Sequence, residues 1–187
     1  WPVFMEYAGP IIGMPFSMEG FAFFLGAIFL GIYLYGWDRI PRAAHLASGV
    51  MVAVCGTMSG VFVVSTNAWM NTPQGFDLDA AGNVVAIRPW EAMFNPSFPA
   101  QALHMTVAAF LALAIGVAGV HAWQLLKDPA SRFHRKAFGI AMIVAALTGV
   151  VMPATGHIAG ETVAHYQPVK LAAMEAHWET EAGAPFI

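Results

Sequence analysis

Long apolar runs separated by short polar stretches dominate the chain. Residues 17–36 read SMEGFAFFLGAIFLGIYLYG, twenty residues in which Glu19 is the only charge. A helix of about 20 residues is about 30 Å long, which matches the hydrocarbon thickness of a bilayer. Three further runs, 45–66, 99–126 and 137–157, are also long enough to span and contain no Asp, Glu, Lys or Arg. The pattern predicts an all-α, polytopic transmembrane helical bundle with four membrane spans.

Composition agrees with a membrane protein and excludes several other classes. Hydrophobic residues make up 58% of the chain, charged residues 10%, and the mean hydropathy is +0.63, whereas soluble domains carry about 25% charged residues. The net charge is −3 and no basic run occurs, so we expect no nucleic-acid partner. The single cysteine, Cys55, excludes a disulfide framework and a site built from several thiolates. The sequence begins at Trp1 without a signal-peptide pattern, and we therefore expect it to be a piece of a longer chain.

The distribution of basic residues predicts the orientation of the spans. Arg88 is the only basic residue of the connection 67–98, and Lys170 is the only one in the tail after residue 157. The two short loops, 37–44 and 127–136, hold the other six basic residues: Arg39, Arg42, Lys127, Arg132, Arg135 and Lys136. By the positive-inside rule these short loops face the cytoplasm, while both termini, the loop 67–98 and the segment 158–187 face outward.

Glu19 is the first candidate functional residue. An ionised carboxylate inside a membrane span is energetically costly, so such residues usually serve a function. Glu19 stands near the outer end of its run, however, and an interfacial carboxylate that reaches headgroup water is the alternative interpretation.

His104 is the second candidate, about five residues inside the outer end of the third span. Steps of four residues place Ala100, Ala108 and Ala112 on its helix face. A neutral imidazole can bind a metal or haem iron, and a flat porphyrin requires small neighbours. The alternative is helix packing through the alanines, with the imidazole hydrogen-bonded to a neighbouring carbonyl. Glu19 and His104 are predicted to lie at similar depth, which favours a shared site.

Other polar residues near the outer side have weaker signals. Ser59 is expected to bond its own helix carbonyl, and Asn67 is either a helix C-cap or a donor to a carboxylate or a porphyrin propionate. Trp69 fits an aromatic belt at the interface. Lys170 and Glu175 are five residues apart and could contact the polar head of a ligand, although their residue pattern alone favours an ordinary solvated helix.

Five motifs resemble subunit I of the cytochrome bd family of quinol oxidases. They occur in the family's order and with similar spacing over nearly the whole chain: Met18-Glu19-Gly20-Phe21, Gly36-Trp37-Asp38-Arg39, the run 67–73 (NAWMNTP), Leu103-His104-Met105-Thr106-Val107, and the run 170–180 (KLAAMEAHWET).

This resemblance implies a function and a set of roles. The family oxidises quinol at the outer face of the bacterial inner membrane and reduces dioxygen to water. It uses a low-spin haem b, a high-spin haem b and a haem d, for which a b-type haem is the alternative here. His104 matches the ligand of the low-spin haem, and Glu19 matches the acid at haem d, its ligand or near neighbour. The resemblance also implies subunit II as a partner, with a small single-span subunit as a further candidate.

The remaining matched positions concern quinol, haem and protons. Lys170 and Glu175 match residues of the quinol-binding loop, which would begin within 158–187. Ser59 and Asn67 match positions near the haem and proton-delivery region, with Ser59 on the proton pathway and Asn67 and Trp69 as haem-binding candidates.

The chain departs from the family pattern at Gly26, where the family usually has a second Glu on the proton route. The family's other haem ligands, a His, a Met and a further acid, lie outside 1–187, so this stretch alone is not expected to hold every haem. A membrane transporter or proton channel, and a haem-binding scaffold without oxidase activity, are the alternative functions.

Overall fold

Four long helices account for most of the structure, a computed structural model that describes residues 2–179, 182 and 183. All four are long and apolar enough to cross a membrane, which confirms the predicted all-α fold with four candidate spans. The long helices are α1 (Pro2–Tyr35), α2 (Arg42–Asn71), α4 (Phe98–Lys127) and α5 (Arg132–Tyr166). The short elements are β1 (Asp77–Leu78), β2 (Val84–Val85), α3 (Pro89–Met93) and α6 (Pro168–Met174).

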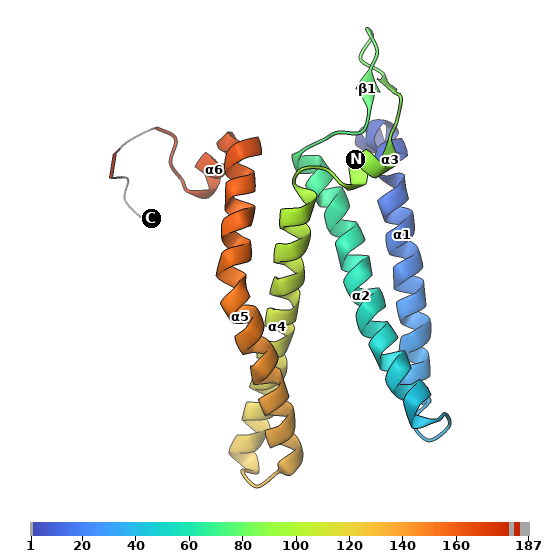
Figure 1. The fold of residues 1–187 in the computed structure, drawn as a ribbon, viewed down its shortest axis with the longest axis vertical. Coiled ribbons are helices and arrows are strands. Elements are labelled where there is room, and N and C mark those ends of the chain that lie inside the picture. Colours follow the sequence, from blue (N-terminus) through green and yellow to red (C-terminus); the bar gives the residue numbers. More distant parts are fainter. Residues whose placement is uncertain (1, 180–181, 184–187) are drawn as a thin grey trace. The chain divides into compact units, whose positions relative to one another are not determined.

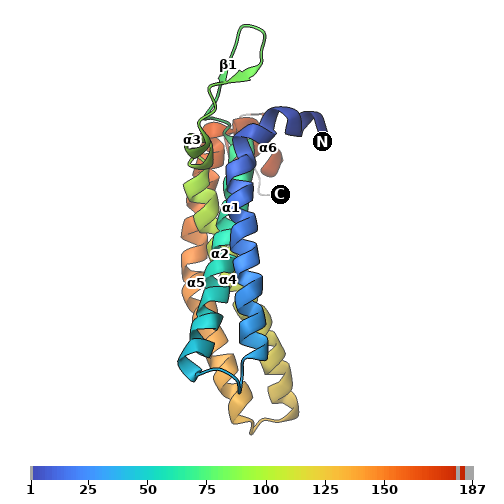
Figure 2. The ribbon, with the colours of Figure 1, turned by 90° about the vertical axis from the view of Figure 1, so that its right-hand side faces the viewer.

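The helices extend beyond the apolar runs that predict them. α1 begins at Pro2 rather than near residue 17, and it contains Pro10 and Pro15. Proline lacks the backbone N–H and bends a helix, and the first turns of α1 lie at a steep angle to the rest (Figure 2). α5 likewise continues past residue 157 to Tyr166 and contains Pro153. The apolar runs therefore mark the part of each helix suited to lipid, and the helices continue outside it.

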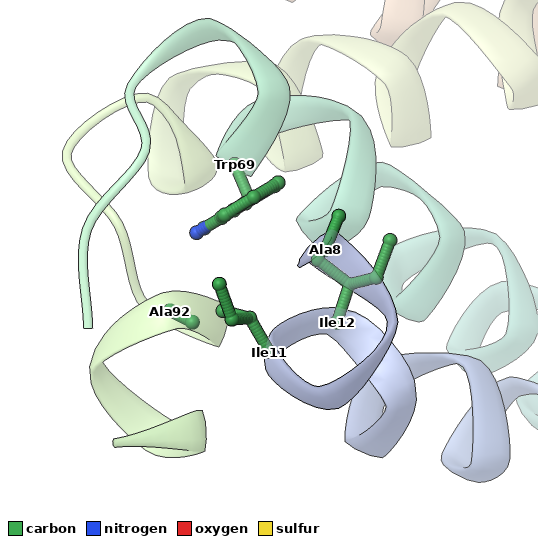
Figure 3. Packing of buried hydrophobic residues seen from close by; sticks show 5 residues of the cluster. All are labelled: Ala8, Ile11, Ile12, Trp69 and Ala92. Carbon is green, nitrogen blue, oxygen red and sulfur yellow. The ribbon is translucent and has the colours of Figure 1, made fainter. Parts of the chain in front are cut away.

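The chain divides into two compact units, residues 1–102 and 103–187. In the first unit, α1 and α2 form an antiparallel hairpin (Figure 1). One end of this hairpin is closed by a cluster of buried apolar side chains, in which the Trp69 ring faces Ile11 of α1 and Ala92 of α3 (Figure 3). Ala8 and Ile12 complete the cluster. α3 is thereby fixed against the end of the α1–α2 pair.

A buried amide secures the connection between α2 and α4. Asn95 is 0% exposed, and its amide nitrogen donates to the carbonyls of Ala92 at 2.9 Å and Ser65 at 3.3 Å. Its amide oxygen accepts from the Thr72 hydroxyl at 3.1 Å, and the Ser97 backbone N–H donates to that hydroxyl at 3.2 Å. Because every polar atom of the amide is paired, burial of this side chain ties the connection to α2 without leaving an unsatisfied group.

The β1–β2 hairpin is held to α3 by Arg88. Its guanidinium donates to both carboxylate oxygens of Asp77, at 3.0 and 3.1 Å, and to Glu91 at 2.7 Å. The hydrogen bond and charge of Arg88 lower the pKa of Asp77 below its usual value. A carboxyl whose pKa is lowered by folding stabilises the folded form above its unfolded pKa, and this contribution is lost as the pH falls through the folded pKa. These groups are exposed, so the contribution is small.

In the second unit, α4 and α5 run antiparallel beside each other and α6 follows α5 (Figures 1 and 2). The buried residues along the two helices are small: Ala114 and Ala118 on α4, and Ala141 and Ala145 on α5. Small side chains let helix backbones approach closely, which is the main source of helix association in lipid.

Gly75 is expected to be essential for the connection between α2 and α4. Its φ is +83°, and an added Cβ would lie 2.6 Å from the Ala92 backbone nitrogen and 2.7 Å from the Arg88 carbonyl. Gly75→Ala therefore combines a left-handed penalty of about 1–2 kcal/mol with a clash against backbone. We expect protease cleavage within residues 72–97 to become faster.

Gly82→Ala is the matched control, because Gly82 also has a positive φ, +84°, but has nothing within 4 Å of an added Cβ. Equal cleavage rates in the two variants would contradict the close packing at Gly75.

Candidate functional site

Glu19 is held by a hydrogen bond from the neighbouring helix. The Ser59 hydroxyl on α2 donates to Oε1 of Glu19 on α1 at 3.1 Å, and both residues are half-buried. The expectation that Ser59 bonds its own helix carbonyl is wrong. That behaviour belongs to Thr57, which donates to the Ala53 carbonyl at 2.9 Å. Ser59 instead lies on the side of α2 that faces α1.

An apolar cluster lies within one turn of this hydrogen bond along the same two helices. Ala22 and Phe62, each three residues from Glu19 or Ser59, are buried together with Met93 of α3. Met14 and Met18 pack against that cluster. A carboxylate–hydroxyl bond in such low-dielectric surroundings is stronger than in water, which favours a fixed carboxylate orientation.

α1 and α2 are close together at Gly26. A Cβ on Gly26 would lie 3.4 Å from the Cβ of Cys55, which is 5% exposed. Position 26 thus points at α2, and the cysteine side chain occupies the space that a longer residue there would enter. Two turns from Glu19, the contact between the helices is closed by small residues.

The His104 imidazole is hydrogen-bonded to a hydroxyl of the neighbouring helix. Its Nδ1 lies 3.2 Å from the Thr155 hydroxyl oxygen on α5, and that hydroxyl donates its single proton to the Met152 carbonyl at 3.0 Å. With the hydroxyl proton placed on that carbonyl, the hydroxyl oxygen accepts from Nδ1–H. In the neutral imidazole this arrangement leaves the lone pair on Nε2. The sequence suggested a hydrogen bond from the imidazole to a neighbouring carbonyl as the alternative to metal binding. In the structure the partner of the imidazole is the Thr155 hydroxyl instead.

The surroundings of His104 suit a flat ligand of the imidazole. Gly156 is adjacent, and an added Cβ there would be 3.5 Å from Cε1 of the ring. Ala108 is half-buried and Ala112 is exposed, so these small residues on the predicted face are not used up by helix packing. Within the described residues no three His, Cys, Asp or Glu side chains gather as a metal site. A haem needs fewer, because its porphyrin supplies the other iron ligands and one imidazole is enough on this side.

The expected sharing of one site by Glu19 and His104 stays a prediction. Glu19 belongs to the first compact unit and His104 to the second. Each unit therefore holds one candidate residue with its own partner. The Glu19 carboxylate is hydrogen-bonded to Ser59, and the His104 imidazole to Thr155.

Asn67 and Trp69 lie apart from the Glu19–Ser59 bond. Asn67 is exposed, and α2 continues past it to Asn71 with Thr72 as the C-cap, so the C-cap interpretation of Asn67 is wrong. Trp69 is 6% exposed, and its indole N–H donates to the Gln74 carbonyl at 2.9 Å. The observed contacts of Trp69 are with the protein, and contact of Asn67 or Trp69 with haem stays a prediction.

Lys170 and Glu175 lie in the short helical segment after α5. Lys170 is an exposed residue of α6, and Glu175 is the exposed C-cap, whose backbone N–H donates to the Leu171 carbonyl at 2.9 Å. The next residue, Ala176, has φ +55°, so the chain turns sharply after the helix. Both polar side chains are thus exposed at one end of the second unit.

Two buried hydroxyls were missed by the sequence patterns. Thr155 orients His104, and Thr66 on α2 is 4% exposed with no partner for its hydroxyl among the described residues. A buried hydroxyl without a partner is uncommon. Counting equal numbers of residues in both directions from the loop between two helices would have paired Glu19 with Ser59. Each of them is twenty residues from position 39 in the α1–α2 loop. The same count from the loop between α4 and α5 places Thr155 within one helical turn of the residue that lies opposite His104.

Comparison with known proteins agrees with these geometries. A structure of bd oxidase from Geobacillus thermodenitrificans matches with a TM-score of 0.92 and 44% identity, covering 100% of this chain and 43% of that one. A Bacillus subtilis (strain 168) protein provisionally named cytochrome bd menaquinol oxidase subunit I is 36% identical over 99% of this chain and 42% of its own length. Cytochrome bd-II ubiquinol oxidase subunit 1 of Escherichia coli (strain K12) is 33% identical over 100% of this chain and 37% of its own.

The chain thus spans about two fifths of the length of these relatives. The sequence profile of one family, cytochrome bd terminal oxidase subunit I, matches residues 1–187. The motifs around Glu19, His104 and Lys170 that indicated this resemblance are therefore parts of a similarity that extends over the whole chain. The chain belongs to the cytochrome bd terminal oxidase subunit I family.

Proposed function

We propose that this chain is a haem-binding part of a respiratory terminal oxidase that oxidises quinol and reduces dioxygen to water. Family membership over the whole chain supports this, as do the relatives, two of which are named menaquinol and ubiquinol oxidases. The observation that carries the proposal is the Thr155 hydroxyl bond, which leaves the Nε2 lone pair of His104 available to iron.

His104 is proposed as the axial ligand of the low-spin haem b. Thr155 accepts from Nδ1–H, orients the ring and makes the imidazole a stronger electron donor. Gly156, the half-buried Ala108 and the exposed Ala112 leave room beside the ring, whereas Ala100 is buried. A bound haem would supply one-electron storage between a two-electron quinol and dioxygen.

Glu19 is proposed to act at the oxygen-reducing haem, which is haem d or a b-type replacement, with a high-spin haem b nearby. Ser59 fixes the carboxylate and is proposed to lie on the proton pathway that supplies it. The side chain can take a proton from that pathway and release it toward the oxygen site. The chain lacks an acid at position 26, so the last proton transfer to Glu19 uses Ser59 and bound water instead.

Lys170 and Glu175 are proposed to bind the quinol head group. An ammonium can donate to a quinol oxygen, and a carboxylate can accept a quinol hydroxyl proton. Asn67 and Trp69 are proposed to lie at the haem periphery, where Trp69 contributes by fixing the end of α2.

The protein is proposed to be a multi-pass protein of the bacterial inner membrane. The termini of this stretch, the connection 67–98 and the quinol-binding segment would lie on the outer side, in agreement with the basic loops at 37–44 and 127–136. Subunit II is the expected partner, with a small single-span subunit as a further one. Electrons from quinol outside and protons from the cytoplasm would then contribute to the proton motive force.

The haem assignment predicts distinct effects of two substitutions. His104→Ala should abolish the low-spin haem b band in a reduced-minus-oxidised spectrum of the intact complex. Thr155→Val should keep the haem but raise its midpoint potential by some tens of millivolts, because a weaker imidazole donor stabilises the ferric form less; about 59 mV corresponds to a tenfold change for one electron.

Thr155→Ser keeps the hydroxyl and should restore the original potential. An unchanged low-spin band in His104→Ala would refute the ligand assignment. Absence of every b- or d-type band in the wild-type complex would refute the oxidase itself and favour a transporter.

The Glu19–Ser59 hydrogen bond predicts a defect in oxygen reduction. Ser59→Ala removes a donor to a carboxylate, worth about 1.5–3 kcal/mol, and should lower turnover by about tenfold with the haem spectrum retained. Thr57→Ala is the control, since Thr57 bonds only its own helix. Equal turnover in the two variants would argue against a role of Ser59 in proton supply.

The close contact between Gly26 and Cys55 predicts that a Glu side chain at position 26 fits only if the side chain at position 55 is made smaller. Gly26→Glu alone should overpack the α1–α2 contact and lower stability by about 1–3 kcal/mol. Adding Cys55→Gly should relieve this, and turnover of the double variant, compared with Cys55→Gly alone, then measures the effect of the acid. A thermal midpoint of Gly26→Glu equal to that of wild type would contradict the closed contact.

A further inference from the structure

Two histidines are hydrogen-bonded to each other near the turn that joins α4 to α5. Nδ1 of His121 on α4 lies 2.8 Å from Nδ1 of His134 on α5, and the ring centres are 5.1 Å apart. Both residues are half-buried, so protons from water can reach them. The turn lies at the end of the hairpin opposite α6 (Figure 1). The function proposed above uses neither residue.

The hydrogen bond defines where the protons of the neutral pair lie. A bond between two imidazole nitrogens needs one N–H and one lone pair, so one Nδ1 donates and the other accepts. Because a neutral imidazole carries a single proton, the donor ring keeps its lone pair on Nε2, and the acceptor ring carries its proton there. The Nε2 atom of the donor ring can therefore take up an added proton without disturbing the shared bond.

One added proton and two added protons have opposite effects on this bond. A proton on the free Nε2 makes the donor ring a cation, and a hydrogen bond with an ionised donor is roughly twice as strong as a neutral one. A second proton removes the accepting lone pair, so that two charged rings would point N–H groups at each other. Two groups that interact in this way titrate in two separate steps. The bond is thus strongest with one added proton and is lost with two.

The packing of the turn couples the bond to the backbone. Ser131 caps α5 by accepting from the His134 backbone N–H at 3.4 Å, so this imidazole is carried by the first turn of the helix. The Phe133 ring packs edge-on against both imidazoles, with centroids 5.8 Å from His121 and 5.2 Å from His134. Loss of the bond between the imidazoles therefore removes a direct connection between the start of α5 and the last turns of α4.

The charged groups of the turn add to the repulsion of a doubly protonated pair. The Asp128 carboxylate accepts from the Ala130 N–H at 3.1 Å, and the Arg135 guanidinium donates to the Pro129 carbonyl at 2.6 and 3.0 Å. All the charged residues at the end of α4, in the loop and at the start of α5 are exposed, and four of the five are basic: Lys127, Asp128, Arg132, Arg135 and Lys136.

We propose that the His121–His134 hydrogen bond is a proton-sensitive clasp of the α4–α5 turn, tightened by one added proton and opened by two. Imidazole is the side chain that changes its charge near neutral pH, whereas the Asp, Lys and Arg side chains of the turn keep theirs. With the orientation proposed above, the turn faces the cytoplasm, and the clasp responds to the pH there. The clasp itself does not depend on the proposed haem and quinol sites.

The test is backbone hydrogen exchange of residues 128–136 in the intact, detergent-purified complex. Exchange is measured from about pH 8 to about pH 4.5, which covers the titration of imidazole, and is corrected for the intrinsic effect of pH on amides. Protection of wild type relative to the double variant His121→Phe with His134→Phe should be about 2–10-fold at the highest pH, should exceed about tenfold at intermediate pH, and should vanish at the lowest.

The two single variants complete a double-mutant cycle, whose non-additive part isolates the contact between the two side chains. A new contact between the two Phe rings in the double variant would add an amount that does not vary with pH. The change of the non-additive part with pH is therefore the decisive quantity. A non-additive part that stays constant across the pH range would overturn the proposal.

The α1–α2 turn is the matched control within the wild-type protein. Nε2 of His45 lies 2.9 Å from the Tyr33 carbonyl oxygen, which can only accept, and a charged imidazole keeps the donor that this bond needs. Residues 36–45 should therefore keep their protection at the pH at which residues 128–136 lose theirs. This comparison needs no variant to fold. Loss of protection at both turns at the same pH, or at neither, would contradict the clasp.

Discussion

Helices in a bilayer gain little from burying apolar side chains against one another, because the lipid is equally apolar; close backbone approach and paired polar groups hold them together. Both hairpins of this chain obey that constraint. Gly26 meets Cys55 between α1 and α2, and Ala114, Ala118 and Ala145 are among the buried residues of the α4–α5 pair. The functional side chains depend on this closeness, since a serine or threonine hydroxyl is too short to reach a partner across a wider gap.

Each candidate site therefore consists of a long functional side chain on one helix and a short hydroxyl on the next. Ser59 restrains Glu19, and Thr155 restrains His104. The arrangement gives orientation without adding another charge to the membrane interior, where charge is costly. It also explains the cost of changing Gly26, because the spacing that brings Ser59 to Glu19 leaves little room for a side chain further along the same contact.

The sequence predicted those features that depend on one helix at a time. Run lengths of apolar residues identified four spans, and Glu19 and His104 were identified by their cost or chemistry within those runs. Features that depend on the neighbouring helix were missed. Ser59 is expected from its sequence to bond its own backbone, because nothing in a single helix shows which face meets another helix. The pairing of Thr155 with His104 could not be predicted for the same reason.

Helix ends were also hard to predict. The C-cap interpretation of Asn67 failed because α2 continues for a further turn, packed there by Trp69 against α1 and α3. Tertiary packing extends helices beyond the limits that local composition suggests. Likewise, α1 passes through two prolines, which local rules treat as helix breakers.

Pro153 interrupts the backbone hydrogen bonding of α5 between its first part and its last turns. It supplies no backbone N–H to the Gly149 carbonyl, so the helix lacks one rung of its ladder just before Thr155. Thr155, the rest of α5 and α6 with Lys170 all follow this weak point, while the alanines that hold α5 to α4 precede it. The partner of the His104 imidazole and the polar segment beyond it are therefore joined to the alanine-packed part of α5 through a turn that lacks one backbone hydrogen bond.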